Sequence, residues 1–230
     1  MLAELRPGQS VELLKELHIL TRDGRLNQDS RRKLKQVEHL VQFIEKIVAE
    51  TTPHAGELTL ADHGAGKSYL GFILYDLLLK GQGSGVVHGI ETRPELVERA
   101  RALAGRLDFG RMRFHNLSAA ASAHDDALPE RIDIVTALHA CDTALHACDT
   151  ATDDAIAFGL AKKAQAMVLV PCCQAELAAC LRQNKALALS RTPLAELWRH
   201  PLHTREMGSQ LTNVLRCLYP ESQGYSVTVT

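Results

Sequence analysis

LTLADHGAGKS, at residues 58–68, joins an apolar run to a glycine-containing turn and then to the start of a helix. Glycines at 64 and 66 let the backbone adopt conformations that other residues avoid, and they let a ligand approach the chain closely. The first amide groups of a helix have no partner within it, so the turn also offers N–H groups to a ligand. A strand, a glycine turn and a helix in this order are typical of a nucleotide-binding α/β unit.

The same alternation continues along the chain. Short apolar runs near residues 58–61, 86–90, 113–114, 132–138 and 167–170 alternate with helical patterns at 68–80, 94–107, 152–164 and 174–183. Runs that are apolar throughout indicate parallel strands covered on both faces. We therefore expect an α/β fold with a Rossmann-like, doubly wound and mostly parallel sheet. Residues 224–230 also have the pattern of a strand, and we expect the C-terminal strand hairpin of such a sheet to be truncated.

An N-terminal helical arm precedes this pattern. Residues 10–20 and 29–50 carry apolar side chains at helical spacing, and the sequence TTP at 51–53 ends the second helix. We expect an arm at residues 1–52 and one domain at residues 53–230. The helix that begins at Ser68 is apolar nearly all round, so we expect the arm to cover its outer side.

Acidic residues beside the glycines indicate which ligand the turn binds. Asp62 precedes the glycines, and Glu91 ends the second apolar run at the interval where such folds place a ribose-binding acid. A carboxylate in the turn suits a cofactor with an ammonium and a sulfonium group, such as S-adenosylmethionine. The alternative is a permissive phosphate-binding loop, in which Lys67 neutralises phosphates and Ser68 binds magnesium. Asp62 opposes that alternative, because a carboxylate repels phosphate.

With these residues in order, the chain resembles the class I S-adenosylmethionine-dependent methyltransferases. The resemblance implies cofactor binding by the residues that match the family's motifs after strands one to four. They are Asp62, Gly64, Gly66, Glu91, Asn116, Leu117 and His139.

Three further motifs make the resemblance narrower. LHACDT at 138–143, ATDD at 151–154 and VPCCQ at 170–174 are similar to the branch that includes methyltransferase-like proteins and tRNA acceptor-stem 2′-O-methyltransferases. The heptapeptide ALHACDT occurs twice in tandem, at 137–143 and 144–150, which leaves open the copy that lines the site.

The ends of strands four and five are the predicted place of reaction. His139 and Asp142 are the candidate catalytic residues, because either side chain can accept the proton of a nucleophile. Pro171, Cys172 and Cys173 are the candidate substrate contacts at the neighbouring strand end. Two alternatives remain: a cysteine thiolate that attacks a pyrimidine, and a zinc site built from the histidines and cysteines of the repeat. We expect no metal, since duplication alone explains the second set of ligands.

Basic residues cluster before the domain, at Arg31, Arg32, Lys33 and Lys35. They favour RNA as the substrate through phosphate contacts, although a solvated helix face explains them equally simply. A second basic stretch runs through Arg182, Lys185, Arg191, Arg199 and Arg205. Aromatic residues are 4% of the chain, which argues against single-strand binding by base stacking.

The sequence thus predicts a cytoplasmic methyltransferase that uses S-adenosylmethionine and acts on an oxygen or nitrogen nucleophile, with RNA favoured. No apolar run is long enough to span a membrane and no secretory signal is recognised. Three alternatives stay open: a small-molecule or protein substrate, a catalytically silent interaction domain, and a phosphate-loop nucleotidase. The sequence does not define the oligomeric state.

Overall fold

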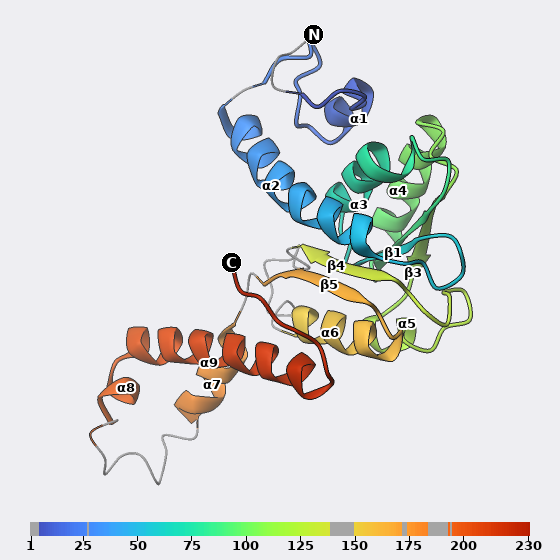
Figure 1. Cartoon of the computed structure of the whole chain (residues 1–230). Helices are drawn as coiled ribbons and strands as arrows, with labels where there is room; N and C mark the ends of the chain where they lie inside the picture. The colour runs from blue at the N-terminus through green and yellow to red at the C-terminus, as the bar shows by residue number, and fades with distance from the viewer. Residues whose placement is uncertain (1–4, 27, 139–149, 172–173, 184–192, 194) are drawn as a thin grey trace.

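The computed structural model describes the whole chain except residues 1–4, 27, 139–149, 172–173, 184–192 and 194 (Figure 1). Its centre is a five-stranded parallel sheet of order β3-β2-β1-β4-β5. The strands are β1 Thr59–His63, β2 Val86–Glu91, β3 Met112–Asn116, β4 Ile134–Leu138 and β5 Ala166–Val170. The predicted Rossmann-like α/β fold is confirmed.

The strand order reverses at β1, which lies between β2 and β4. Asp62 on β1 is in register with Gly89 on β2 and with Thr136 on β4. In an open parallel sheet the crevice beyond the carboxyl ends at such a reversal is where ligands bind. The glycine turn follows β1 directly, so the fold places it at this crevice.

One face of the sheet carries α3 Tyr69–Leu74, its π-helical continuation η1 Tyr75–Leu79, and α4 Pro94–Arg106. The arm, with α1 Val11–Glu16 and α2 Gln28–Glu50, lies over the same side (Figure 1). Val41 and Ile44 of α2 belong to the same buried cluster as Phe72 and Leu74. The arm therefore shares the main hydrophobic core with the domain, as burial of the apolar helix after Ser68 requires.

The opposite face carries α5 Ala119–Ser122 and α6 Ala151–Ala161, which packs below the sheet in Figure 1. A smaller apolar cluster holds this layer, and it includes Ile90, Val135 and Phe158 from β2, β4 and α6. The helices therefore cover both faces, and the sheet is doubly wound as predicted.

Three helices follow the sheet: α7 Ala175–Gln183, α8 Ala195–Arg199 and α9 Pro201–Ser222. Helices α7 and α9 lie very close together, because a Cβ atom built on Gly208 of α9 would lie 2.7 Å from the Ala178 Cβ of α7. Within the described part of the chain, no helix combines the length and apolar character needed to cross a bilayer.

One predicted element is wrong. Residues 224–230 have a strand pattern, but no regular structure forms there. The segment is fixed at its start by Tyr225, whose hydroxyl donates a hydrogen bond to the Ala164 carbonyl at 2.6 Å. A strand requires a neighbouring backbone for its ladder, and no described residue pairs with this segment. A second difference is that the sequence analysis did not foresee helices α5, α8 and α9.

Candidate functional site

The glycine turn after β1 has the backbone that its sequence predicts. Gly64 and Gly66 have φ angles of 64° and 57°, in the left-handed region that glycine tolerates best. Ser68 also has a positive φ, of 53°, although it carries a side chain. The contacts of Ser68 with its neighbours therefore have to hold a backbone conformation that a non-glycine residue seldom adopts.

Asp62 of β1 provides that support through hydrogen bonds. Its Oδ2 atom accepts hydrogen bonds from the Ser68 hydroxyl at 3.0 Å and the Gly71 N–H at 3.3 Å. Its Oδ1 atom accepts one from the Thr136 hydroxyl at 3.2 Å. Asp62 is 3% exposed, and burial raises the pKa of its carboxyl to about 6 against the opposing effect of these hydrogen bonds.

This geometry corrects the contact that the sequence analysis gave to Asp62. The carboxylate was expected to face the ammonium group of a cofactor across the crevice. It instead lies under the turn and is hydrogen-bonded to protein groups. Asp62 supports the glycine turn through these hydrogen bonds. An indirect effect of Asp62 on cofactor binding, through the shape of that turn, stays a proposal.

Glu91 lies at the end of β2 on the other side of the turn. Its Oε2 atom accepts a hydrogen bond from the Gly66 N–H at 2.7 Å. Its Oε1 atom accepts from the Arg93 N–H and from Arg93 Nε, each at 3.0 Å. Burial alone would raise the pKa of Glu91, but the hydrogen bonds from Arg93 and Gly66 outweigh it and lower the pKa. Glu91 is therefore ionised at neutral pH.

Asn116 and Leu117 meet the same strand end. Asn116 is in register with Glu91, and its Nδ2 atom donates to the carbonyl of Glu91 at 3.1 Å and to that of Thr92 at 2.8 Å. The Leu117 N–H donates to the Glu91 carbonyl at 3.2 Å. The structure thus brings Gly66, Glu91, Asn116 and Leu117 together, and their binding of the cofactor stays a prediction.

The turn does not fit the phosphate-binding alternative, because protein acceptors already occupy its N–H groups. Ala65 donates to the Ile90 carbonyl at 2.9 Å, Gly66 donates to Glu91, and Ser68 N–H donates to the Ala65 carbonyl at 2.6 Å. Ser68, the expected magnesium ligand, is fully buried. A phosphate-binding loop needs such groups directed at the ligand.

His63 follows Asp62 and was not foreseen as a notable residue. It is 4% exposed, and neither ring nitrogen has a hydrogen-bond partner among the residues that the structure describes. Its ring packs against the Phe158 ring with centroids 5.1 Å apart. Burial lowers the pKa of His63 to about 4, so the imidazole is neutral at physiological pH.

The predicted reaction residues His139, Asp142, Cys172 and Cys173 lie outside the described residues, as does the repeat that would supply zinc. The two strand ends that carry them are neighbours, since Leu138 of β4 is in register with Val170 of β5. Pro171 follows β5 and is half-buried. Among the described residues there is no group of three or more histidine, cysteine or acidic side chains that could hold a metal ion.

The basic residues of the arm lie on the outer surface of α2. Arg31, Arg32 and Lys35 are all exposed, whereas the apolar Leu34 between them is buried. Of the second basic stretch, Arg199 forms an exposed ion pair with Glu196 at 2.6 Å, and Arg205 is exposed.

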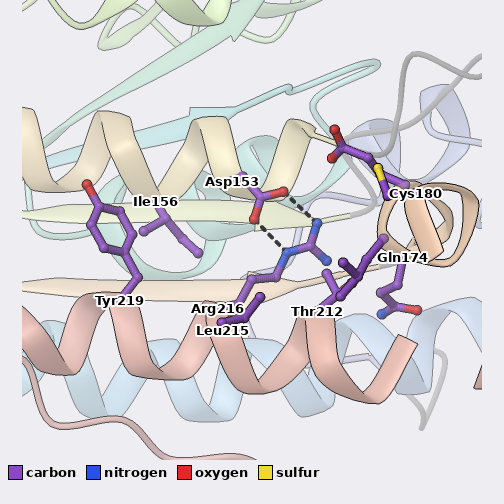
Figure 2. Close-up of a pocket in the computed structure, with 10 residues that line it drawn as sticks. Asp153, Ile156, Gln174, Cys180, Thr212, Leu215, Arg216 and Tyr219 are labelled. Carbon is purple, nitrogen blue, oxygen red and sulfur yellow. Dashed lines mark hydrogen bonds and ion pairs between the residues drawn. The ribbon is translucent and has the colours of Figure 1, made fainter. Parts of the chain in front are cut away.

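A cavity of about 400 Å³ lies between α6, α7 and α9 (Figure 2). Asp153 and Arg216 line this cavity and form an ion pair, in which Arg216 donates from Nε and Nη2 to the two oxygens of Asp153, each at 2.8 Å. Gln174, the residue before α7, also lines the cavity and joins the exit of β5 to α9 by accepting from the Ser209 hydroxyl at 2.8 Å.

This cavity was not predicted from the sequence, because α9, which forms one of its walls, was not predicted either. The signal was present: Leu211, Val214, Leu215 and Leu218 follow helical spacing after a proline that suits a first helical turn.

With the fold and site described, comparison with known proteins gives the family. A methyltransferase domain family matches residues 32–144 and 143–180, which is more than half of the chain. The chain belongs to this family, whose class uses S-adenosylmethionine as methyl donor. The two matched segments meet inside the tandem heptapeptide, so each contains one copy. The predictions of a methyltransferase and of its cofactor are confirmed at this level.

Several solved structures are similar to the chain at low sequence identity. Magnesium protoporphyrin IX methyltransferase from Synechocystis PCC 6803, with bound SAH, is 17% identical with a TM-score of 0.43, over 76% of this chain and 72% of that one. An rRNA methylase from Streptococcus thermophilus is 15% identical with a TM-score of 0.36, over 54% and 62%. The YcgJ protein of Bacillus subtilis is 21% identical with a TM-score of 0.34, over 45% of this chain and 38% of that one.

The chain therefore spans well under two thirds of the YcgJ protein. No curated protein matches the sequence.

The charge of Glu91 and the open backbone of the glycine turn suit S-adenosylmethionine. Glu91 is an ionised acceptor at the strand end where such folds hold a ribose, and Gly66 places no side chain over the turn. The exposed Asn116 and half-buried Leu117 lie beside Glu91, where the family resemblance places the adenine.

Proposed function

We propose that this chain transfers the methyl group of S-adenosylmethionine to an oxygen or nitrogen nucleophile of RNA. The observation that carries the proposal is the meeting of Gly66, Glu91 and Asn116 at the carboxyl ends of adjacent strands. In the cofactor complex that we propose, the Glu91 carboxylate holds the ribose hydroxyls, and Asn116 with Leu117 borders the adenine.

The reacting groups meet at the ends of β4 and β5. When bound, the cofactor supplies a methyl group on a positively charged sulfur. The nucleophile forms its bond to the methyl carbon as the carbon–sulfur bond breaks, which leaves S-adenosylhomocysteine. We assign the proton of the nucleophile to His139 or Asp142, and contacts with the acceptor to Pro171, Cys172 and Cys173. The main task of these residues is alignment, because fixing two reactants in line supplies much of a rate enhancement.

The RNA part of the proposal rests on α2. Arg31, Arg32 and Lys35 present positive charge on one exposed surface, and the neighbouring Lys33 adds to the charge of this segment. Contacts with phosphates position a nucleic acid without reading its sequence. Binding releases counterions from the nucleic acid, and this release is less favourable at high salt, so the contacts weaken as the salt concentration rises. The arm thus orients RNA, while the strand ends select the methylated atom.

The test is incubation of the protein with labelled methyl donor and purified tRNA at low and high salt, and in parallel with a cell lysate. We expect label in tRNA, and we expect the double variant Arg31→Glu/Arg32→Glu to transfer less at low salt than the control Arg99→Glu. Arg99 is an exposed arginine of α4 and does not belong to α2. Transfer to no RNA, together with label in a protein or metabolite fraction, would overturn the RNA assignment but leave the methyltransferase assignment intact.

A small-molecule acceptor is the second candidate, and the cavity between α6, α7 and α9 favours it. About 400 Å³ lies in the range of small-molecule sites, and the lining joins apolar side chains to a few polar groups. If this candidate holds, label enters metabolites, and Leu215→Arg, which fills the cavity with charge, abolishes that transfer.

A further inference from the structure

The Glu91 carboxylate is surrounded by more donors than it can fully satisfy. Oε1 accepts from the Arg93 N–H and Nε, each at 3.0 Å, and from the Thr92 hydroxyl at 3.1 Å. Oε2 accepts from the Gly66 N–H at 2.7 Å and from Arg93 Nη2 at 3.2 Å. An ionised carboxylate offers about four lone-pair sites. These five contacts therefore leave no acceptor site for a ligand.

A ribose would bring two further hydroxyl donors to the same oxygens. Two of the present donors, the N–H groups of Gly66 and Arg93, belong to the backbone and cannot leave without a change in the turn. The Arg93 guanidinium is on a long side chain that is 25% exposed, so it can move into solvent. Its departure alone removes one donor from each carboxylate oxygen, so that three donors remain for about four acceptor sites.

The guanidinium also lies against the glycine turn itself. A Cβ atom built on Gly66 would have Arg93 Nη2 as its nearest neighbour, at 3.8 Å. The positive charge of Arg93 thus lies beside the turn that borders the proposed cofactor site. A guanidinium at that position repels a cofactor whose sulfur and amino group are both positively charged.

We propose that Arg93 is an internal competitor for the ribose site, and that its guanidinium must leave Glu91 before an adenosine cofactor binds. This inference rests on the proposed function and adds an affinity control to the same site. Free energy spent on breaking the Glu91–Arg93 ion pair is lost from cofactor binding, so Arg93 sets the affinity below what Glu91 and the turn would give.

The test is calorimetric titration of S-adenosylhomocysteine into the wild-type protein and Arg93→Met, which keeps the aliphatic stem and removes the guanidinium. Because a hydrogen bond to a charged group is worth about a tenfold change in a dissociation constant, we expect Arg93→Met to bind about tenfold more tightly. Arg99→Met changes an exposed arginine of α4, the helix that follows Arg93, so it is the matched control and keeps wild-type affinity.

Two further measurements separate competition from a structural role. Arg93→Met is expected to melt at a lower temperature while it binds more tightly, whereas a residue that merely supports the site would lower stability and affinity together. The gain in affinity is expected with adenosine and not with 2′,3′-dideoxyadenosine, which lacks the hydroxyls that compete with Arg93. Arg93→Gln is the second variant and serves if Arg93→Met does not fold.

The outcomes are distinct. Equal or weaker binding by Arg93→Met, with binding intact in the wild-type protein, overturns the competition. Binding by Arg93→Met where the wild-type protein binds nothing measurable supports it. Absence of binding in both proteins overturns the proposed function, and the competition with it.

Discussion

The Ser68 hydroxyl donates a hydrogen bond to Asp62 Oδ2 at 3.0 Å, and this contact ties the end of the glycine turn to the strand that begins it. Both residues are buried, and the Gly71 N–H shares the same oxygen. A Cβ atom on Gly71 would lie 2.5 Å from the Ser68 hydroxyl oxygen and 3.0 Å from Asp62 Oδ2, so glycine is needed for the close approach. The turn is thus shaped from inside the protein before any ligand binds.

Removal of the Ser68 hydroxyl is predicted to destabilise the fold. Ser68→Ala takes one donor from a buried carboxylate, and we expect the free energy of unfolding to fall by about 1–3 kcal/mol. The loss is expected to be larger at pH 7 than at pH 5, because the hydrogen bond matters most to the ionised carboxylate, whose pKa is about 6. Urea denaturation at both pH values measures this. An equal loss at both would contradict the assignment of an ionised acceptor.

Asp62 itself is predicted to give stability a pH dependence. Burial raises its pKa from 3.8 to about 6, so the folded protein keeps this proton over a pH range in which the unfolded chain has lost it. The folded state binds more protons there, and stability therefore falls as pH rises from about 4 to about 6. Asp62→Asn removes this contribution, so the wild-type curve minus the variant curve is expected to slope downward across that window. A flat difference would show that burial does not perturb Asp62.

His63 is predicted to be a site where an apolar residue stabilises the protein. Its ring nitrogens are buried and have no partner in the described part of the chain, which costs about 1–3 kcal/mol. We expect His63→Leu to be more stable at pH 7. The difference in stability between His63→Leu and the wild-type protein is expected to grow as pH falls from about 6.5 to about 4. Over this range the imidazole of His63 binds a proton in the unfolded chain and not in the folded protein. Exposed His124→Leu is the control. A less stable His63→Leu would indicate that the imidazole has a partner in solution.

The ion pair between α6 and α9 is predicted to hold the C-terminal helices. The Arg216 side chain is 7% exposed, and Asp153→Asn would remove the negative charge that this largely buried guanidinium contacts. Since Asp153 is half-exposed, solvent screening reduces the loss to about 1–3 kcal/mol. Hydrogen exchange of α9 is expected to accelerate. The control is Arg199→Met, whose ion pair is exposed on both sides. Equal exchange in the two variants would refute this role.

The sequence was a good guide where backbone pattern decides the structure. The alternation of short, mostly apolar runs with helical patterns predicted all five strands, and the left-handed backbone at Gly64 and Gly66 follows from glycine itself. It was a poor guide to side-chain direction. Whether Asp62 faces the crevice or the core depends on the partners that Ser68, Gly71 and Thr136 place around it, and those come from three different elements.

The C-terminal region was harder for a related reason. Helix α9 has apolar side chains at helical spacing, but about half of each of Val214, Leu215 and Leu218 stays exposed, so burial alone does not explain the pattern. Residues 224–230 have strand propensity without a ladder partner among the described residues, and propensity alone does not form a strand.

The most direct measurement is the affinity for S-adenosylhomocysteine of the wild-type protein, Glu91→Gln and the control Glu98→Gln, an exposed glutamate of α4. We predict binding by the wild-type protein and by Glu98→Gln, and a loss of about tenfold or more in Glu91→Gln, because an ionised acceptor for the ribose hydroxyls is gone. Equal affinity in all three proteins, or magnesium-dependent ATP binding that requires Lys67, would contradict the account.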